Sequence, residues 1–280
     1  MSRYVYLNNK YIKYKDANIH IEDRGFQFSD SVYEVIKVIK SKLLDFNFHI
    51  RRLKYSTKEL DFNFKLDKKK LHQIFINLIK KNKLHNGIIY LQITRGVQTR
   101  EHAYKKNLKP NLIIYTTNKN FNLPNKNYKG FKAITYPDIR WARPDIKTTS
   151  LLANILAATH ASNKGAYEAI FFKGNTITEA AHSNVWIIKK NNIITHPANK
   201  EILKGVTRTV LINIINSTGL SLKEKKFTKK DLYKSDEIFI TSSGSLITPI
   251  IQVDKYKINN GKIGTITKFL ALNLYKSIVQ

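Results

Sequence analysis

The sequence predicts an α+β protein with two domains, each a mixed sheet with packed helices. Three observations lead to this prediction. A chain of 280 residues with 42% apolar side chains can bury a sizeable core. Strand-like and helix-like segments occur in both the first and the second part of the chain. Between them, a polar stretch with Pro124 interrupts the periodicity. We therefore expect an N-terminal domain at 1–120, a linker at 121–130 and a C-terminal domain at 131–280.

The first part of the chain is expected to open with strands. Residues 4–14 predict a hairpin that turns at Asn8 and Asn9, and residues 32–46 alternate like a second hairpin that turns near Ser41. Two further strands follow at 87–96 and 110–118.

Two helices are expected to lie against these strands. Asn47 is a candidate N-cap for a helix over 49–60, and Asp67 for a helix over 68–82. The second helix carries an apolar stripe of Leu71, Ile74, Phe75, Leu78 and Ile79.

The second part of the chain repeats the mixture of strands and helices. Strands are expected at 131–137, 167–179, 184–196 and 237–241, and helices at 150–165, 207–220 and 266–279. Gly165 and Gly219 are placed to end the first two of these helices.

The chain is strongly basic, with a net charge of +29. Such a charge can indicate nucleic acid or an anionic membrane as a partner. Here nine basic residues are arginines and the other forty are lysines, and no aromatic-interleaved basic tract accompanies them. We interpret the charge as a solvated surface that helps to attract anionic cofactors and substrates, and expect no specific nucleic acid partner.

The absence of cysteine excludes disulfides, thiolate metal sites and a thiol nucleophile. The polar start of the chain is unlike a signal peptide, and no apolar run is long enough for a membrane span. We expect a cytoplasmic protein without a metal site.

Lys147 and Glu179 are the most informative residues. A lysine amine can form a Schiff base with a carbonyl cofactor, and a carboxylate can keep the nitrogen of a pyridine ring protonated. Lys147 stands just before the predicted helix at 150–165, and Glu179 lies where a predicted strand gives way to Ala180 and Ala181. A surface lysine and a solvated turn carboxylate are the alternatives. Together the two residues indicate a pyridoxal-phosphate enzyme.

Two segments are candidates for a phosphate site. Gly205 begins a predicted helix, so the amides of Val206 and Thr207 point outward where the helix dipole favours an anion. Ser242 and Ser243 follow a predicted strand, and their hydroxyls and amides can contact the same phosphate. An ordinary threonine cap and a plain turn are the alternatives.

The residues carry a family resemblance over almost the whole chain. The sequence resembles the fold-type IV pyridoxal-phosphate enzymes, which include D-amino-acid aminotransferase, branched-chain aminotransferase and aminodeoxychorismate lyase. Seven motifs occur in the family's order: EDRGFQFSDSVYEVIKV (22–38), HIRRL (49–53), YLQITRGVQTREH (90–102), PDIRWARPDIK (137–147), TITEAAHSNVW (176–186), THPANKEILKGVTR (195–208) and TSSGSLITPI (241–250).

The resemblance implies roles for residues that match the motifs. Lys147 is implied as the Schiff-base lysine of pyridoxal 5'-phosphate and Glu179 as the partner of the ring nitrogen. Arg52 is implied as the guanidinium that grips the phosphate, since an arginine fork suits this group. Because Arg51 adjoins Arg52, one of the pair should face away, and a surface helix arginine is the alternative for Arg52. The phosphate cradle is completed by Val206, Thr207, Ser242 and Ser243.

The resemblance also implies a site for the substrate carboxylate. In D-amino-acid aminotransferases an Arg-x-His pair and a Tyr hold this group, and Arg100, His102 and Tyr33 match them. If the segment is extended, Arg100 and His102 point to the same side and can converge on one carboxylate. In the family this pair reaches the site from the neighbouring subunit, so we expect a homodimer with a shared active site. An exposed polar loop is the alternative for residues 99–102.

The run after Glu179 departs from the serine-rich or glycine-containing run that is common in this subgroup. Ala180, Ala181 and His182 stand there, which leaves the preferred substrate side chain open. His182 is a candidate hydrogen-bond partner of an acidic substrate, with a structural or solvent-facing position as the alternative. Trp141 is a candidate neighbour of the cofactor or a core aromatic residue.

We therefore expect pyridoxal-phosphate-dependent transamination between a D-amino acid and a 2-oxo acid, of the D-alanine or D-glutamate type. The alternatives on the same scaffold are a branched-chain L-amino-acid aminotransferase and an aminodeoxychorismate lyase. A remote alternative of another class is a basic, non-catalytic nucleic-acid-binding protein, which predicts salt-sensitive binding and no bound chromophore.

Overall fold

The computed structural model describes residues 3–125 and 128–279, which divide into two compact units. Unit 1 consists of Met1–Asn120 and Ile146–Ser150, and unit 2 of Phe121–Asp145 and Leu151–Gln280. Lys126 and Asn127 of the expected linker lie outside the described residues. The segment 146–150 belongs to unit 1, although the sequence pattern predicts it within the domain at 131–280.

The elements of unit 1 are β1 (Tyr4–Leu7), β2 (Lys10–Lys13), α1 (Arg24–Gln27), β3 (Ser31–Ile39), β4 (Lys42–Leu43), α2 (Phe46–Glu59), α3 (Lys68–Lys81), β5 (Gly87–Thr94) and β6 (Asn111–Asn118). Those of unit 2 are β7 (Phe131–Pro137), α4 (Leu152–Asn163), β8 (Glu168–Lys173), β9 (Thr176–Ala180), β10 (Asn184–Lys189), β11 (Asn192–Thr195), α5 (Val206–Ser217), β12 (Ser221–Glu224), α6 (Lys229–Tyr233), β13 (Glu237–Ser242), β14 (Leu246–Val253), β15 (Tyr256–Lys257) and α7 (Thr265–Val279).

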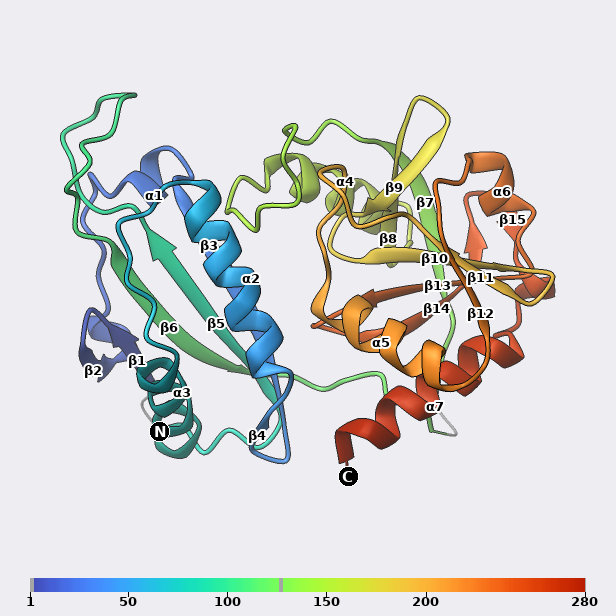
Figure 1. Ribbon diagram of the computed structural model, residues 1–280, viewed down its shortest axis with the longest axis horizontal. Coiled ribbons are helices and arrows are strands. Elements are labelled where there is room, and N and C mark those ends of the chain that lie inside the picture. Colours follow the sequence, from blue (N-terminus) through green and yellow to red (C-terminus); the bar gives the residue numbers. More distant parts are fainter. Residues whose placement is uncertain (1–2, 126–127, 280) are drawn as a thin grey trace. The chain divides into compact units, whose positions relative to one another are not determined.

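Unit 1 is one sheet covered on one face by two helices. The strand order is β2-β1-β6-β5-β3-β4, and the strand pairs are antiparallel. Helices α2 and α3 lie over one face of this sheet (Figure 1). Val32 and Ile36 of β3 are fully buried there together with Leu53 of α2 and Phe75 and Leu78 of α3, and burial of such side chains stabilises the unit by about 1.5–3 kcal/mol each.

Of the two helix N-caps predicted for unit 1, one is confirmed and the other is wrong. The Asp67 carboxylate accepts a hydrogen bond from the Lys70 amide at 3.0 Å, as expected of an N-cap. The prediction that Asn47 caps the preceding helix is wrong. Asp45 is the N-cap, because a left-handed backbone at this residue, with φ of 55°, turns the chain out of β4 and starts α2 at Phe46.

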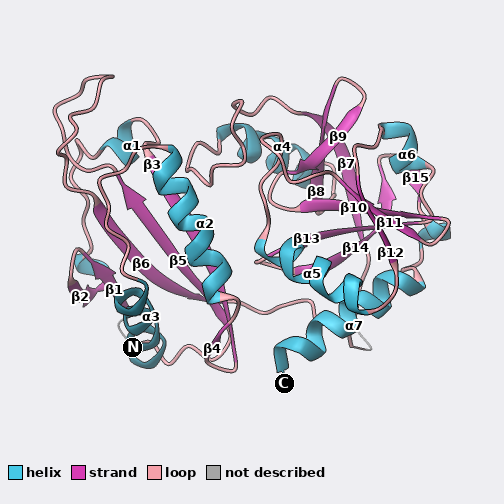
Figure 2. Ribbon diagram, viewed as in Figure 1, coloured by secondary structure: helices cyan, strands magenta, loops and turns pink. Residues whose placement is uncertain are grey.

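Unit 2 is built on a larger, mixed sheet. Its order is β12-β11-β10-β13-β14-β7-β8-β9, with β15 paired to β14. The pairs β11–β12, β7–β14 and β7–β8 are parallel, and the others are antiparallel. Helices α5 and α7 pack on β13 and β14, and α4 packs on β7 and β8 (Figure 2). The core under α5 and α7 includes Trp186, Leu211, Ile215, Phe239 and Leu270, all fully buried. Within residues 3–125 and 128–279, every helix is too short or too polar to span a lipid bilayer.

Candidate active site

The backbone of Lys147 is held between a strand and a helix of unit 1. The Tyr33 amide donates to the Lys147 carbonyl at 3.0 Å, and the Thr149 amide donates to the Ser31 carbonyl at 3.1 Å. Residues 147–149 thereby extend the sheet beside the first residues of β3. On the other side, the Lys147 amide donates to the Ser56 hydroxyl of α2 at 3.1 Å. The position of Lys147 is therefore fixed by two elements far from it in sequence.

The Lys147 side chain is half-buried and lies over an aromatic ring. Its Nζ is 4.1 Å from the centroid of the Tyr33 ring, a distance typical of a cation–π contact. Tyr33 in turn stacks on Tyr90 at 5.7 Å, and Tyr90 stacks on Tyr115 at 4.9 Å. The amine thus lies at the end of a row of tyrosines on β3, β5 and β6.

Arg52 is held in a buried ion-pair cluster. Its Nε donates to Glu34 Oε1 and its Nη2 to Glu34 Oε2, both at 2.8 Å, and His49 Nδ1 lies 2.7 Å from the same Oε2. Burial raises the pKa of Glu34, but the charge and hydrogen bonds of Arg52 and His49 outweigh it and lower this pKa to about 2. Arg51 is exposed and lies over the Phe48 ring at 4.6 Å, so the two arginines do face different ways. The orientation of Arg52 is therefore fixed by Glu34, a partner that no pattern in the sequence indicates.

Arg100 and His102 converge on one aromatic ring of unit 1. Arg100 Cζ is 5.0 Å from the centroid of the Phe28 ring, and the His102 and Phe28 rings are 5.6 Å apart. Both side chains are exposed. The loop that carries them is fastened by Arg24, whose Nη1 donates to the Glu101 carbonyl at 2.6 Å and whose Nη2 donates to the His102 carbonyl at 3.0 Å. Arg24 follows the acidic pair of the motif EDRG, but nothing in that pattern indicates its distant partners.

Glu179 is a buried carboxylate at the end of β9 in unit 2. Oε1 accepts from the Leu203 amide at 3.1 Å and from Arg140 Nη1, and Oε2 accepts from Asn184 Nδ2 at 3.1 Å. Burial raises the pKa of Glu179 to about 7, against the lowering effect of Arg140 and the Leu203 amide. Asp138 binds the same guanidinium at 2.7 Å and adds a small rise in the pKa of Glu179. A carboxyl group with such a pKa can share a proton with a basic nitrogen near neutral pH.

Asn184 links Glu179 to the start of α5. Its amide nitrogen also donates to the Leu203 carbonyl at 2.8 Å. A Cβ at Gly205, the N-cap residue of α5, would lie only 2.1 Å from Asn184 Oδ1, so a larger residue here would displace the Asn184 side chain. Asn184 pairs with Thr241 in the β10–β13 ladder, directly before Ser242. One side chain of β10 therefore connects the carboxylate, the N-terminus of α5 and the end of β13.

The expected phosphate residues are placed as follows. Val206 and Thr207 are buried in the first turn of α5, where no side chain caps the helix. The first four amides of an α-helix have no acceptor within the helix, and the amides of these two residues belong to that group. Ser242 and Ser243 are half-buried at the end of β13, and the Ser242 and Ser245 hydroxyls are 2.9 Å apart. The helix terminus and the hydroxyls provide the kind of donors that bind an anion.

The contacts of His182 and the exposed position of Trp141 assign neither residue a role in the site. His182 Nδ1 lies 2.5 Å from Oε2 of the fully buried Glu168, and Ser183 Oγ donates to the same oxygen at 3.0 Å. Trp141 is exposed. Among residues 3–125 and 128–279 there is no cluster of three or more histidine or acidic side chains suited to a metal ion.

The sequence matches a known family over most of its length. The family described as Amino-transferase class IV matches residues 31–253. A protein named D-alanine aminotransferase from Listeria monocytogenes serotype 1/2a is 39% identical over 265 residues, which cover 94% of this chain and 92% of the relative. A protein of the same name from Staphylococcus aureus strain MSSA476 is 35% identical over 276 residues, covering 98% and 97%.

Solved structures agree with the fold. The branched-chain amino acid aminotransferase from Thermobaculum terrenum, in its PLP form, superimposes with a TM-score of 0.89 at 22% identity. The match covers 99% of this chain and 94% of that structure. At this identity the likeness concerns the fold, and it confirms the predicted fold-type IV architecture.

Proposed function

The chain belongs to the class IV aminotransferases, which use pyridoxal 5'-phosphate, and we propose that it transfers an amino group between a D-amino acid and a 2-oxo acid. Relatives named D-alanine aminotransferase, 35% to 39% identical over nearly the full length, support this choice of substrate. The structural observation that carries the proposal is Glu179, a buried carboxylate held by an arginine, an asparagine and a backbone amide.

The residues present fit the cofactor. A protonated pyridine ring needs a nearby carboxylate, and Glu179 offers one that is held in place. A phosphate needs convergent donors, and the uncapped first turn of α5 and the Ser242 hydroxyl provide them. When bound, the cofactor supplies a ring that accepts the electron pair released at the α-carbon of the amino acid.

We assign the cofactor contacts to the residues that match the family's motifs. Lys147 is the Schiff-base lysine, and Glu179 holds the ring nitrogen. Arg52 grips the phosphate together with Val206, Thr207, Ser242 and Ser243. Glu34 supports this role of Arg52, because it fixes the guanidinium in one orientation.

Lys147 has a second task in this proposal, which is to move a proton. Its Nζ takes the proton from the α-carbon of the amino acid, and hydrogen bonds from Tyr33 and to Ser56 hold the lysine backbone during this transfer. A Lys147→Ala variant should lose turnover, and a Glu179→Gln variant should lose rate while remaining folded. Full turnover by Lys147→Ala would refute the assignment.

Arg100, His102 and Tyr33 are assigned to the substrate carboxylate. The structure supports the first two because both side chains gather on Phe28 and Arg24 fastens their loop. Two donors on one side of a loop can converge on a carboxylate. As in the family, the pair would serve the active site of a neighbouring subunit.

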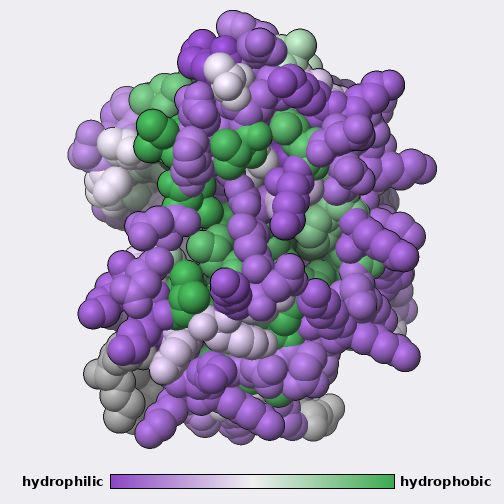
Figure 3. Space-filling view, turned by 90° about the vertical axis from the view of Figure 1, so that its left-hand side faces the viewer, coloured by the Kyte–Doolittle hydropathy of each residue, from purple (hydrophilic) through white to green (hydrophobic). Residues whose placement is uncertain are grey.

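Exposed apolar side chains support a homodimer. Ile21 and Phe26, beside the loop of Arg100, are 75% and 77% exposed. Figure 3 shows apolar side chains among hydrophilic ones on the face that lies at the left in Figure 1. Large exposed apolar patches mark interfaces more often than free surface. Sedimentation analysis should show a dimer, and a monomer that is fully active would contradict the shared site. We also propose a cytoplasmic location, in keeping with a chain that lacks cysteine.

The decisive experiment compares D-alanine and L-leucine, each with 2-oxoglutarate, in an assay of the purified holoenzyme. We expect turnover of D-alanine. The Arg100→Ala variant should raise the KM for D-alanine by about tenfold or more, because a charged hydrogen bond to a carboxylate contributes about 1.5–3 kcal/mol.

Arg51→Ala is a matched control for this variant. Arg51 is another exposed arginine over a phenylalanine ring, at 4.6 Å compared with 5.0 Å for Arg100. Its loss should leave the KM unchanged. Turnover of L-leucine alone would place the enzyme with the branched-chain aminotransferases, and an unchanged KM in Arg100→Ala would make residues 99–102 an ordinary loop.

A further inference from the structure

A cavity of about 530 Å³ opens on unit 1 between the first turns of α2 and α3. Its lining comes from the turn between β4 and α2 and from the start of α3. The lining residues are Leu43, Asp45, Phe46, Asn47, Phe48, Lys68, Lys69 and His72. None of them has a role in the proposed transamination.

One wall of the cavity is formed by Leu43 and by an aromatic ring that packs against two others. The Phe46 ring packs edge-on against the His72 ring at 5.0 Å and against the Phe75 ring at 5.7 Å. Leu43 and Phe46 are half-buried and belong to the border of the core of unit 1. A ring held in this way can receive another planar group without rearrangement, and aromatic pairs contribute about 0.5–1.5 kcal/mol beyond burial.

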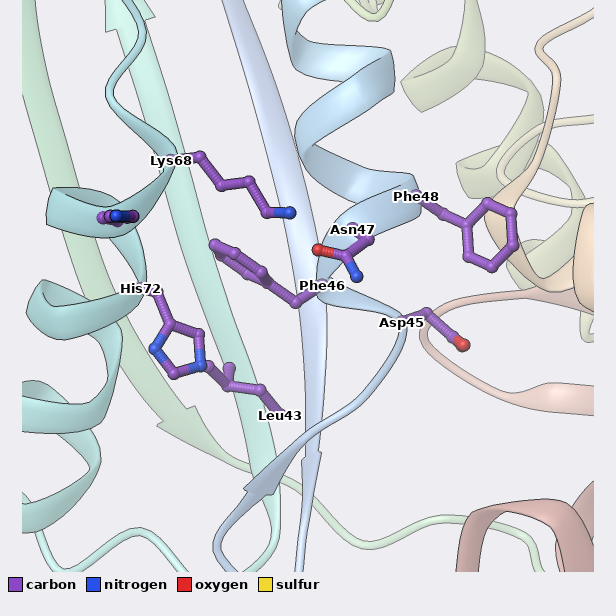
Figure 4. A pocket seen from close by; sticks show the side chains of 8 residues that line it. Leu43, Asp45, Phe46, Asn47, Phe48, Lys68 and His72 are labelled. Atoms are coloured by element: carbon purple, nitrogen blue, oxygen red, sulfur yellow. The ribbon is translucent and has the colours of Figure 1, made fainter.

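The rim of the cavity is positively charged. Lys68 and Lys69 belong to it, and within residues 3–125 and 128–279 neither ammonium group forms an ion pair or a hydrogen bond. Figure 4 shows the Lys68 side chain extending past Phe46 towards Asn47, whereas the Asp45 side chain points away. The cavity therefore presents cations next to an aromatic ring, and its carboxylate lies apart from them.

The start of α2 adds further donors to the same rim. No side chain caps this helix, and the Phe48 and His49 amides already bond to the Asp45 carbonyl at 3.0 and 3.2 Å. The amides of Phe46 and Asn47 precede these two and carry the partial positive charge of the helix N-terminus. The Asn47 side chain, which is exposed, stands beside them with an amide donor.

We propose that this cavity binds a small organic anion with a planar ring, the ring against Phe46 and the anionic group among Lys68, Lys69 and Asn47. Lysine ammonium groups and helix amides bind phosphate and carboxylate alike, so the anionic group is of either kind. The volume suits a ligand of the size of a mononucleotide or an aromatic acid.

Calorimetric titration of the holoenzyme tests this proposal with three probes. AMP carries a ring and a phosphate, benzoate carries a ring and a carboxylate, and inorganic phosphate has no ring. We expect AMP or benzoate, or both, to bind, and inorganic phosphate to bind at least about tenfold more weakly, which corresponds to about 1.4 kcal/mol. The comparison of AMP with benzoate identifies the preferred anionic group.

Two double variants locate the binding site. Lys68→Gln with Lys69→Gln should raise the dissociation constant of the bound probe by about tenfold or more. Lys80→Gln with Lys83→Gln removes the same charge from the last turn of α3 and the turn that follows it, where both side chains are exposed, and should leave the constant unchanged.

A Phe46→Leu variant tests the aromatic wall. It should weaken the ring-bearing probe and leave inorganic phosphate unaffected, and an unfolding curve checks that the unit stays folded. The proposal is overturned if neither ring-bearing probe binds, if inorganic phosphate binds as tightly as they do, or if the Lys68 and Lys69 variant binds like the wild type.

Discussion

Replacement of Glu34 by glutamine tests the buried cluster that orients Arg52. The substitution keeps the size of the side chain and removes the charge that Arg52 and His49 share. Glu34 is fully buried, so solvent does not compensate for the loss. The Arg52 guanidinium would then be left beside a neutral amide, whose oxygen accepts but whose NH2 group cannot accept from Arg52 or His49.

The pKa of Glu34 sets the magnitude of this effect. The carboxyl titrates at about 2 instead of 4.5, which corresponds to about 3 kcal/mol of stability at neutral pH. A lowered pKa contributes stability above the unfolded value, and this contribution is lost as the pH falls through the folded value. The difference between wild type and Glu34→Gln should therefore be about 3 kcal/mol at pH 7 and about half of that at pH 3.

Urea unfolding of both proteins at several pH values between 7 and 3 measures this difference. Glu22→Gln is the control, because the Glu22 side chain forms no ion pair within residues 3–125 and 128–279. It should unfold like the wild type at every pH. A stability difference for Glu34→Gln that does not change with pH would refute the reasoning, since it would then come from packing and not from charge.

Three further substitutions follow from close contacts. Gly205→Ala places a methyl group where an asparagine oxygen lies 2.1 Å away, so we expect binding of pyridoxal phosphate to weaken about tenfold in an absorbance titration of the apoenzyme, and an unchanged constant would contradict this. Ser56→Ala removes the hydroxyl that accepts from the Lys147 amide at 3.1 Å and should cost about 1 kcal/mol in urea unfolding; no loss would mean that water replaces the hydroxyl. Gly264→Ala would bring a Cβ to 1.8 Å from Glu237 Cδ, so the free energy of unfolding should fall by about 2 kcal/mol or more and the melting temperature should fall with it. A melting temperature like that of the wild type would count against this contact.

Much of the fold is visible in the sequence because local patterns specify it. Asn8 and Asn9 adopt left-handed backbone, with φ of 45° and 71°, as a tight hairpin between β1 and β2 requires. Gly165 and Gly219 also have positive φ, just after α4 and α5. Such features depend on a few neighbouring residues, and the periodicity of the strands and helices adds the rest.

The grouping of residues 146–150 with unit 1 has no local signal. Their contacts are to Ser31 and Tyr33 of β3 and to Ser56 of α2, far away in sequence. Short elements such as β12 and β15 were likewise not expected, because each takes its hydrogen bonds from a neighbouring strand and carries little periodicity of its own. Pairing between distant segments is decided by the whole sheet.

The residues of the candidate site also fall into two groups, those that the sequence indicates and those that only the fold reveals. Lys147 and Glu179 stand out in the sequence because their chemistry and their surroundings point to a cofactor. The residues that hold the site together do not, because Glu34, Arg24 and Asn184 are ordinary polar residues until the fold brings their partners to them. Their identification needs the three-dimensional contacts.

Arginine and lysine occupy different places in the structure, and this difference explains where the large positive charge lies. Arg24 and Arg208 are buried and bound to carboxylates and carbonyl oxygens, and Arg52 is bound to Glu34 in the same manner. A planar fork suits such sites better than a lysine ammonium. Among the described residues, Lys37 is the buried lysine, so the lysine excess lies almost entirely on the surface. The net charge of +29 is thus mainly a property of the solvated surface, and it says little about the fold.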